Sequence, residues 1–167
     1  MNKIEEYWKI LSNTNDWIKY SDTKATILLT LYGVLLTIIY TNAEDTLDAL
    51  TKSNWILFFS VLSAISSVVS IVYAFLCINP RLKNENPNSI IYFGHIQSKF
   101  NNATDYRDLA NEIINNDTKY IEEISEQVFT NSNIAWKKFS NVSWSIRFFF
   151  ASIIFLVFSI AIYLIVG

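Results

Sequence analysis

The sequence predicts an all-α membrane protein: three transmembrane helices, with a mainly helical cytosolic region between the second and the third. Three apolar runs cover residues 25–41, 54–78 and 141–166, and only Arg147, near the start of the third run, is charged within them. Each run has about the length that a helix needs to cross the apolar core of a bilayer. Hydrophobic residues make up 51% of the 167 residues and aromatic residues 16%, which is high for a small soluble domain.

Residues 1–24, ahead of the first run, predict an amphipathic cytosolic helix. Apolar side chains such as Ile4, Trp8 and Leu11 recur at a spacing of three or four, and the polar string at residues 12–16 is a candidate break. The aromatic face suits either the membrane interface or packing against the rest of the cytosolic region. Because this charged segment does not resemble a cleavable signal peptide, we expect the first apolar run to be retained.

Small and hydroxyl-bearing residues form a stripe on each of the first two spans. Their spacing of three or four residues places them on one helix face. Such stripes are typical of close packing between membrane helices, and the alternative is a pore lining. The helix-packing or pore residues are Thr26, Thr30, Gly33 and Thr37 in the first span and Ser60, Ser63, Ser67 and Ser70 in the second. The acidic connection at residues 42–53 is expected to be an external loop.

The polar region at residues 79–140 is too long to be a turn, and we interpret it as a sensing region. Its beginning, at residues 80–88, has the composition of a loop. The aromatic run at 90–96 fits a short strand, an interfacial helix or a buried plug. Apolar residues within 106–114 then predict a short amphipathic helix, after which Asp117 is predicted to cap the next helix.

Neither proline nor glycine interrupts residues 117–166, which predicts one helix of about 50 residues that ends as the third span. Its length, roughly 75 Å at the rise of an α-helix, is compatible with the transmission of a mechanical signal and equally with a simple stalk.

The distribution of basic residues predicts the orientation of the chain in the membrane. Four Lys or Arg residues precede the first span, one lies between the first two spans and eight follow the second. By the positive-inside rule, the amino terminus and the sensing region are cytosolic and the carboxyl terminus is external. The protein is therefore expected to be a multi-pass membrane protein.

Composition excludes several classes of function. A net charge of −2 gives no basic field for nucleic acid, so no nucleic-acid partner is expected. One cysteine and one histidine cannot build a structural zinc site, and no metal or cofactor is expected. No nucleophile elbow, phosphate loop or paired carboxylate set is found, and His95 has no evident acid or base partner, so we expect no enzyme activity and no catalytic residue.

Aromatic and polar residues in the sensing region are the candidates for ligand binding. Aromatic faces stack on bases and basic side chains pair with phosphate, so this set can hold a small nucleotide. An ordinary packed juxtamembrane domain explains the same residues. The candidates are Tyr92, Phe93, His95, Tyr106, Arg107, Gln127 and Lys138, with Asn131 and Lys137 nearby in sequence.

Three short motifs resemble the Pycsar effector family of bacterial membrane proteins. The first, Asp22-Thr23-Lys24-Ala25, enters the first span, and the second, Tyr92-Phe93-Gly94-His95-Ile96, follows the second span. The third runs from Glu126-Gln127 through Asn133, Ala135 and Lys138 toward the third span. The resemblance extends from about residue 15 to residue 160.

The resemblance implies an effector of antiphage defence. A partner cyclase would make cyclic CMP or cyclic UMP on infection, and the effector would respond by disrupting the inner membrane as a homo-oligomer, causing abortive infection. Asp22, Lys24, Phe93, His95, Gln127 and Lys138 are the matching positions. The alternatives are a membrane scaffold or anchor for a cytosolic partner protein and an ungated, holin-like toxin.

A coupling role is predicted for Asp22, Lys24 and Arg147. The orientation places Asp22 at the cytosolic membrane boundary, where Lys137, Lys138 and Arg147 also lie. We therefore expect Asp22 to form an ion pair with one of these three cations.

Overall fold

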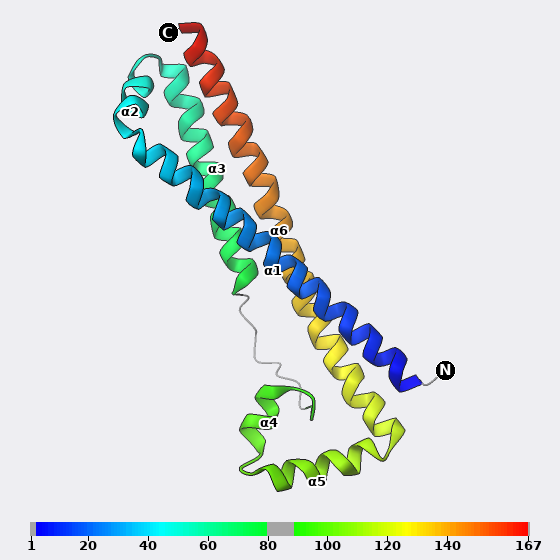
Figure 1. Ribbon diagram of the computed structural model, residues 1–167. Helices are drawn as coiled ribbons and strands as arrows, with labels where there is room; N and C mark the ends of the chain where they lie inside the picture. The colour runs from blue at the N-terminus through cyan, green and yellow to red at the C-terminus, as the bar shows by residue number, and fades with distance from the viewer. Residues whose placement is uncertain (1–2, 80–88, 167) are drawn as a thin grey trace. The chain divides into compact units, whose positions relative to one another are not determined.

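The computed structural model of the protein describes residues 3–79 and 89–166, in which all the regular elements are α-helices (Figure 1). The helices are α1 (Lys3–Thr41), α2 (Ala43–Thr51), α3 (Asn54–Ile78), α4 (Phe93–Lys99), α5 (Ala103–Ile114) and α6 (Asp117–Val166). Three of them, α1, α3 and α6, are long and apolar enough to cross a membrane. The predicted all-α membrane fold with three spanning helices is thus confirmed.

The chain divides into two compact units. The first, which we call the polar unit, contains residues 1–20 and 80–137; the second, the spanning unit, contains residues 21–79 and 138–167. Helices α1 and α6 each contribute residues to both units, because the boundaries fall after Tyr20 and after Lys137.

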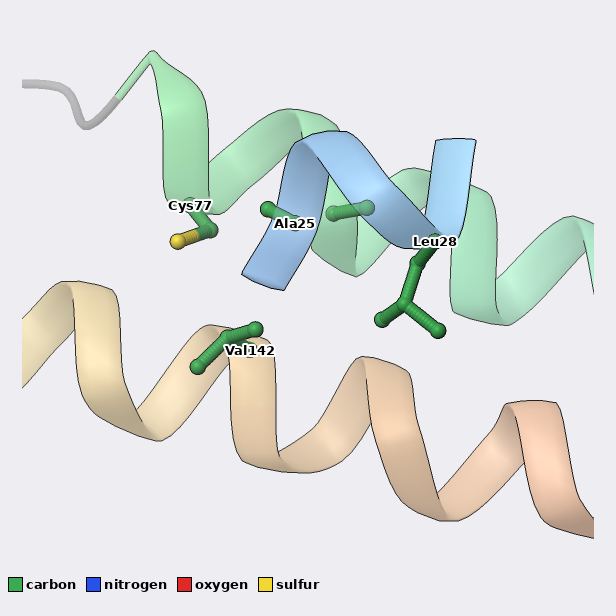
Figure 2. Packing of buried hydrophobic residues seen from close by; sticks show 5 residues of the cluster. Ala25, Leu28, Cys77 and Val142 are labelled. Carbon is green, nitrogen blue, oxygen red and sulfur yellow. The ribbon is translucent and has the colours of Figure 1, made fainter. Parts of the chain in front are cut away.

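The core of the spanning unit is built from side chains of three helices, and three of its five residues are small (Ala25, Ala74 and Cys77). Ala25 and Leu28 of α1 pack with Ala74 and Cys77 of α3 and with Val142 of α6, and all five are buried (Figure 2). Small side chains allow helix backbones to approach closely, which supplies the packing that a bilayer does not provide through the hydrophobic effect. The remaining surfaces of these helices expose large apolar side chains, as lipid-facing surfaces do.

The core of the polar unit is small and lies around α5. Ile90, Ala110 and Ile113 are buried together, and Tyr106 and Tyr120 pack against them. Helix α5 begins where Asn102 accepts a hydrogen bond from the amide of Asp105 at 2.9 Å, an ordinary N-terminal cap.

Several boundaries differ from the predictions. Residues 12–16 do not break α1, which is continuous from Lys3 to Thr41. Within it the Thr14 hydroxyl donates to the Ile10 carbonyl at 2.9 Å. The predicted external loop at 42–53 contains the short helix α2. Asp117 does not cap α6; Asn116 does, by accepting from the amide of Lys119 at 3.2 Å.

The aromatic run at 90–96 is not a strand, since α4 begins at Phe93. By contrast, α3 matches the predicted span at 54–78, and α6 is a single helix of 50 residues, as predicted. The loop expected at residues 80–88 lies outside the described residues.

Candidate functional site

In the polar unit, the segment before α4 is held in place by residues of α5 and α6. The amide of Ile90 donates to Oε2 of Glu123 at 2.7 Å, and the Ser89 hydroxyl lies 3.4 Å from the Glu123 carbonyl oxygen. The Tyr106 hydroxyl donates to the Ile90 carbonyl at 3.3 Å. Because a carboxylate that accepts from a backbone amide makes a strong hydrogen bond, Glu123 anchors the segment that leads into the Tyr92–Ile96 motif.

The motif presents an aromatic surface. The ring centroids of Tyr92 and Phe93 lie 5.0 Å apart, and Phe93 is 78% exposed. A methyl group added at Gly94 would come within 2.7 Å of the Tyr92 ring, so this position needs a residue without a side chain unless the ring moves. The exposed face of Phe93, beside the tilted Tyr92 ring, is a surface on which a planar base can stack.

The Phe100 ring packs against both His95 and Tyr106. The Phe100 ring contacts both edge-on, with centroid distances of 6.3 Å to His95 and 5.5 Å to Tyr106. Nε2 of His95 is buried and makes no hydrogen bond within the described residues. The imidazole ring packs against Phe100.

The polar unit also contains a chain of side-chain amides that joins α6 to α1. Nε2 of Gln127 donates to Oδ1 of Asn131 at 2.9 Å, and Nδ2 of Asn131 donates to Oδ1 of Asn15 at 2.7 Å. Gln127 is 7% exposed, and its Oε1 accepts no hydrogen bond from any described residue. A buried acceptor without a donor is unfavourable, which makes this end of the amide chain a natural place for a ligand donor.

Among the other sequence candidates, Arg107 and Lys137 are exposed. Arg107 reaches the carboxylate of its neighbour Asp108 through two nitrogens, at 3.0 and 3.1 Å. Exposed pairs of this kind contribute little to stability, so the guanidinium can exchange its partner for a phosphate at low cost.

In the spanning unit, Lys138 bridges α1 and α3. Its side chain is 7% exposed, and Nζ donates to Oδ1 of Asp22 at 2.5 Å and to the carbonyl oxygen of Ile78 at 3.4 Å. The carbonyl belongs to the last turn of α3, where a cation is favoured by the helix dipole. The expected ion pair of Asp22 is thus found with Lys138.

The two other residues predicted for coupling, Lys24 and Arg147, are not partners in the Asp22–Lys138 ion pair. Arg147 is exposed and sits over the Trp144 ring at 4.8 Å from its centroid, a cation–π contact. Lys24 is exposed on α1. The ammonium group of Lys138, included among the ligand candidates, has two protein partners in this packing.

The serine stripe of α3 packs against α6. The Ser60 hydroxyl lies 2.8 Å from that of Ser159, and the Ser63 hydroxyl donates to the Ser152 carbonyl at 2.9 Å. Ser70 and Ser145 each donate to the other's carbonyl oxygen, at 2.7 and 2.8 Å. These contacts bring the two backbones close and satisfy the hydroxyls within the bundle. Ser67, the fourth member of the stripe, is half-buried.

The stripe on α1 behaves differently. Thr26, Thr30, Gly33 and Thr37 are exposed within one chain, and no atom lies within 4 Å of the place where a Gly33 side chain would be. The threonine hydroxyls donate to carbonyls four residues earlier in their own helix, at 2.9 to 3.0 Å. The face is therefore free of unsatisfied donors and can lie against lipid or against another helix.

Among residues 3–79 and 89–166, no group of three or more His, Cys, Asp or Glu side chains is arranged to hold a metal ion. A family model described as the Pycsar effector protein domain matches residues 6–165. The chain belongs to the Pycsar effector family. It is also 26% identical, over 143 residues, to the Pycsar effector protein PtPycTM of Propioniciclava tarda, a match that covers 83% of this chain and 69% of the relative. No solved structure matches the chain.

Membership of the Pycsar effector family implies a role in antiphage defence, and the resemblance noted in the sequence is confirmed. The matched range includes most of both units of this chain. The family match and the three apolar helices identify a membrane protein.

Sequence reasoning missed several residues of this Pycsar effector. Ser145, Ser152 and Ser159 follow Lys138 at intervals of seven, a repeat that predicts one continuous contact face on α6. Asn15 and Glu123 carried no such signal, because a single polar residue on an amphipathic helix is usually solvated.

Proposed function

We propose that this Pycsar effector responds to a cyclic pyrimidine mononucleotide, cyclic CMP or cyclic UMP, by disrupting the bacterial inner membrane. A partner cyclase supplies the nucleotide on phage infection, and loss of the membrane barrier causes abortive infection. The observation that carries this proposal is the family match over residues 6–165. On this proposal the chain catalyses no reaction and needs no cofactor.

We place the ligand site in the polar unit. The exposed Phe93 ring, with the half-buried Tyr92 ring beside it, offers a stacking surface for a base, and Gln127 offers a buried acceptor for an N–H group. Arg107 is an exposed cation for the cyclic phosphate. His95 and Tyr106 support this surface through Phe100. Lys138 is assigned instead to the pair with Asp22, with Lys24 and Arg147 as further basic residues of the spanning unit.

The membrane-disrupting form is proposed to be a homo-oligomer. Three spanning helices are too few to enclose a conducting path, so several copies are required. The exposed face of Thr26, Thr30, Gly33 and Thr37 supports this step, because small residues with internally satisfied hydroxyls allow close approach of a second helix. The same face would line a pore if the copies surround an aqueous path.

The proposed orientation places the amino terminus and residues 79–140 in the cytosol and the carboxyl terminus outside. The excess of Lys and Arg before the first span and after the second supports it. This orientation would give the polar unit access to a nucleotide made inside the cell.

A membrane anchor for a cytosolic partner protein is the second candidate. Phe93 and Phe129, both in the polar unit, are 78% and 69% exposed, and large exposed aromatics are typical of protein-binding surfaces. An ungated toxin is the third, since a spanning bundle can also permeabilise a membrane without a ligand.

A phage-infection experiment distinguishes the three. Bacteria carrying the effector with its partner cyclase, the effector with a catalytically inactive cyclase, or neither are infected while membrane potential is recorded. The proposal predicts depolarisation and loss of plaques only when the active cyclase is present. Depolarisation without the cyclase would indicate an ungated toxin. Protection without depolarisation, together with stoichiometric recovery of a crosslinked partner, would indicate an anchor.

A further inference from the structure

Tyr32, in the middle of the spanning part of α1, has a hydroxyl that the packed bundle does not satisfy. The side chain is 3% exposed, and its oxygen is sealed from solvent and makes no hydrogen bond with any residue of 3–79 or 89–166. The ring contacts Phe149 of α6 edge-on at a centroid distance of 5.4 Å. The Tyr32 ring therefore packs against an apolar side chain of α6.

The position of Tyr32 follows from the heptad geometry of α1. Ala25 and Leu28, seven and four residues earlier, lie on the same helix face and pack against Ala74, Cys77 and Val142 (Figure 2). Tyr32 therefore continues the face of α1 that is buried against α3 and α6. Its hydroxyl belongs to the interior of the spanning unit and not to the lipid-facing surface.

Two pairs of serines at this level of the bundle are hydrogen-bonded between α3 and α6. Phe149 lies between Ser145 and Ser152 on α6, and these two serines are hydrogen-bonded with Ser70 and Ser63 of α3. The buried serines thus gain partners from the α3–α6 contact, whereas Tyr32 brings a donor from α1 to which neither helix offers an acceptor.

An unpaired hydroxyl in a dry interior disfavours the packing that buries it. Within a bilayer the cost is not relieved by bulk water, because the hydrocarbon core supplies none. Any rearrangement that admits water beside Tyr32 would restore the lost hydrogen bond. The cost of one such group corresponds to a factor on the order of ten in a two-state equilibrium.

We propose that the Tyr32 hydroxyl is a hydration trigger, which biases the spanning helices away from their dry packing and binds water as they separate. The inference rests on the proposed function, since hydration of the bundle interior is the step that membrane disruption requires. It goes beyond that function by assigning the bias to a single oxygen atom.

Tyr32→Phe removes this atom and leaves the ring, so it tests the proposal with little risk to folding. Tyr40→Phe is the matched control, because Tyr40 is on the same helix and 82% exposed. In detergent micelles without nucleotide, Tyr32→Phe should raise the midpoint of thermal unfolding by several degrees, while Tyr40→Phe should not change it. In liposomes, Tyr32→Phe should raise the concentration of cyclic pyrimidine nucleotide needed for half-maximal dye release by roughly tenfold.

The two measurements separate failure of this proposal from failure of the proposed function. If the wild-type protein releases no dye with any cyclic nucleotide, the proposed function fails, and the thermal midpoint still decides whether the hydroxyl destabilises the dry packing. If Tyr32→Phe leaves the midpoint unchanged or lowers it, the hydroxyl is satisfied in the resting protein and the hydration trigger is overturned. The hydration trigger is also overturned if Tyr32→Phe and Tyr40→Phe shift the nucleotide requirement equally.

Discussion

The ammonium group of Lys138 is shared between the carboxylate of Asp22 on α1 and the last turn of α3, so one side chain of α6 holds all three spanning helices. The arrangement is asymmetric, because the Lys138 side chain is 7% exposed and that of Asp22 is 38% exposed. Loss of the two partners should therefore have unequal effects.

Asp22→Asn should destabilise the spanning unit by about 2–3 kcal/mol, because it leaves a buried ammonium group without its anion and only partial solvent access offsets the loss. Lys138→Met should cost less, since Asp22 can turn to water. The double variant should recover part of the loss. Unfolding free energies measured by denaturant titration in micelles would show this, with Lys137→Met as the control. Equal losses from both single variants, with no recovery in the double variant, would contradict the shared-cation arrangement.

Ser70, in the stripe on α3, is buried, whereas Thr30, in the stripe on α1, is exposed. Replacing each of them by leucine should therefore have different effects on stability. Ser70→Leu should destabilise the bundle by about 1–3 kcal/mol, because Ser70 is fully buried against Ser145 and has no room for a larger side chain. Thr30→Leu should leave the monomer within about 0.5 kcal/mol of wild type, because its side chain is exposed in one chain.

The same Thr30→Leu variant should reduce crosslinking between copies if the Thr26–Thr37 face is the oligomer contact. Unfolding in micelles measures the stability of the monomer, and chemical crosslinking measures the association of copies. An unchanged yield of crosslinked oligomer would show that this face is not the contact between copies.

Glu123→Gln tests the anchor of the Tyr92–Ile96 motif. The change keeps the shape of the side chain and removes the charge that strengthens its bond to the Ile90 amide, so about 1–2 kcal/mol of local stability should be lost. Hydrogen exchange of the Ile90 and Ile91 amides should accelerate accordingly, and nucleotide binding should weaken. Glu122→Gln, one residue away and exposed, is the matched control. If the Ile90 and Ile91 amides exchange at the same rate in both variants, Glu123 does not anchor the segment.

The Lys119–Glu112 pair, 2.8 Å apart, gives the polar unit a pH dependence at its surface. The hydrogen bond from Lys119 lowers the pKa of Glu112 below its ordinary 4.5, and the same bond raises the pKa of Lys119 above 10.5. The stabilisation from Glu112 is complete above about pH 4.5 and is lost as pH falls through the lowered pKa; that from Lys119 is complete below about pH 10.5 and is lost as pH rises through the raised pKa.

Carbon-detected NMR titration of Glu112 should therefore give a midpoint below that of a glutamate in an unfolded peptide. The midpoint should return toward the ordinary value in Lys119→Met. A midpoint that does not respond to this substitution would show that the pair does not form in solution.

The long apolar elements were predictable because their signal is strong and continuous. The second span at 54–78 and the helix at 117–166 contain neither proline nor glycine, and both ended where expected. The N-terminal part of α1 was less clear, because the polar string at 12–16 resembles a break. The structure resolves it through tertiary contact: Asn15 bonds with Asn131, which lies 116 residues away in the sequence.

The candidate site was predictable only as a region. Tyr92, Phe93 and Gln127 are distinctive residue types on short motifs, but the anchoring role of Glu123 depends on a contact over 33 residues. The stripe on α3 was identified from its spacing, yet its partners on α6 depend on helix pairing that spacing alone does not determine. The unsatisfied Tyr32 hydroxyl has no sequence signal at all, since it is defined by the acceptors that its neighbours lack.

The most direct test of the account is dye release from liposomes that contain the purified protein, with cyclic CMP, cyclic UMP, cyclic AMP or cyclic GMP added in turn. Ligand-gated membrane disruption predicts release with at least one of the two cyclic pyrimidine nucleotides and none with the two purine nucleotides or without nucleotide. Release that is equal for all four nucleotides, or absent with all four, would contradict it.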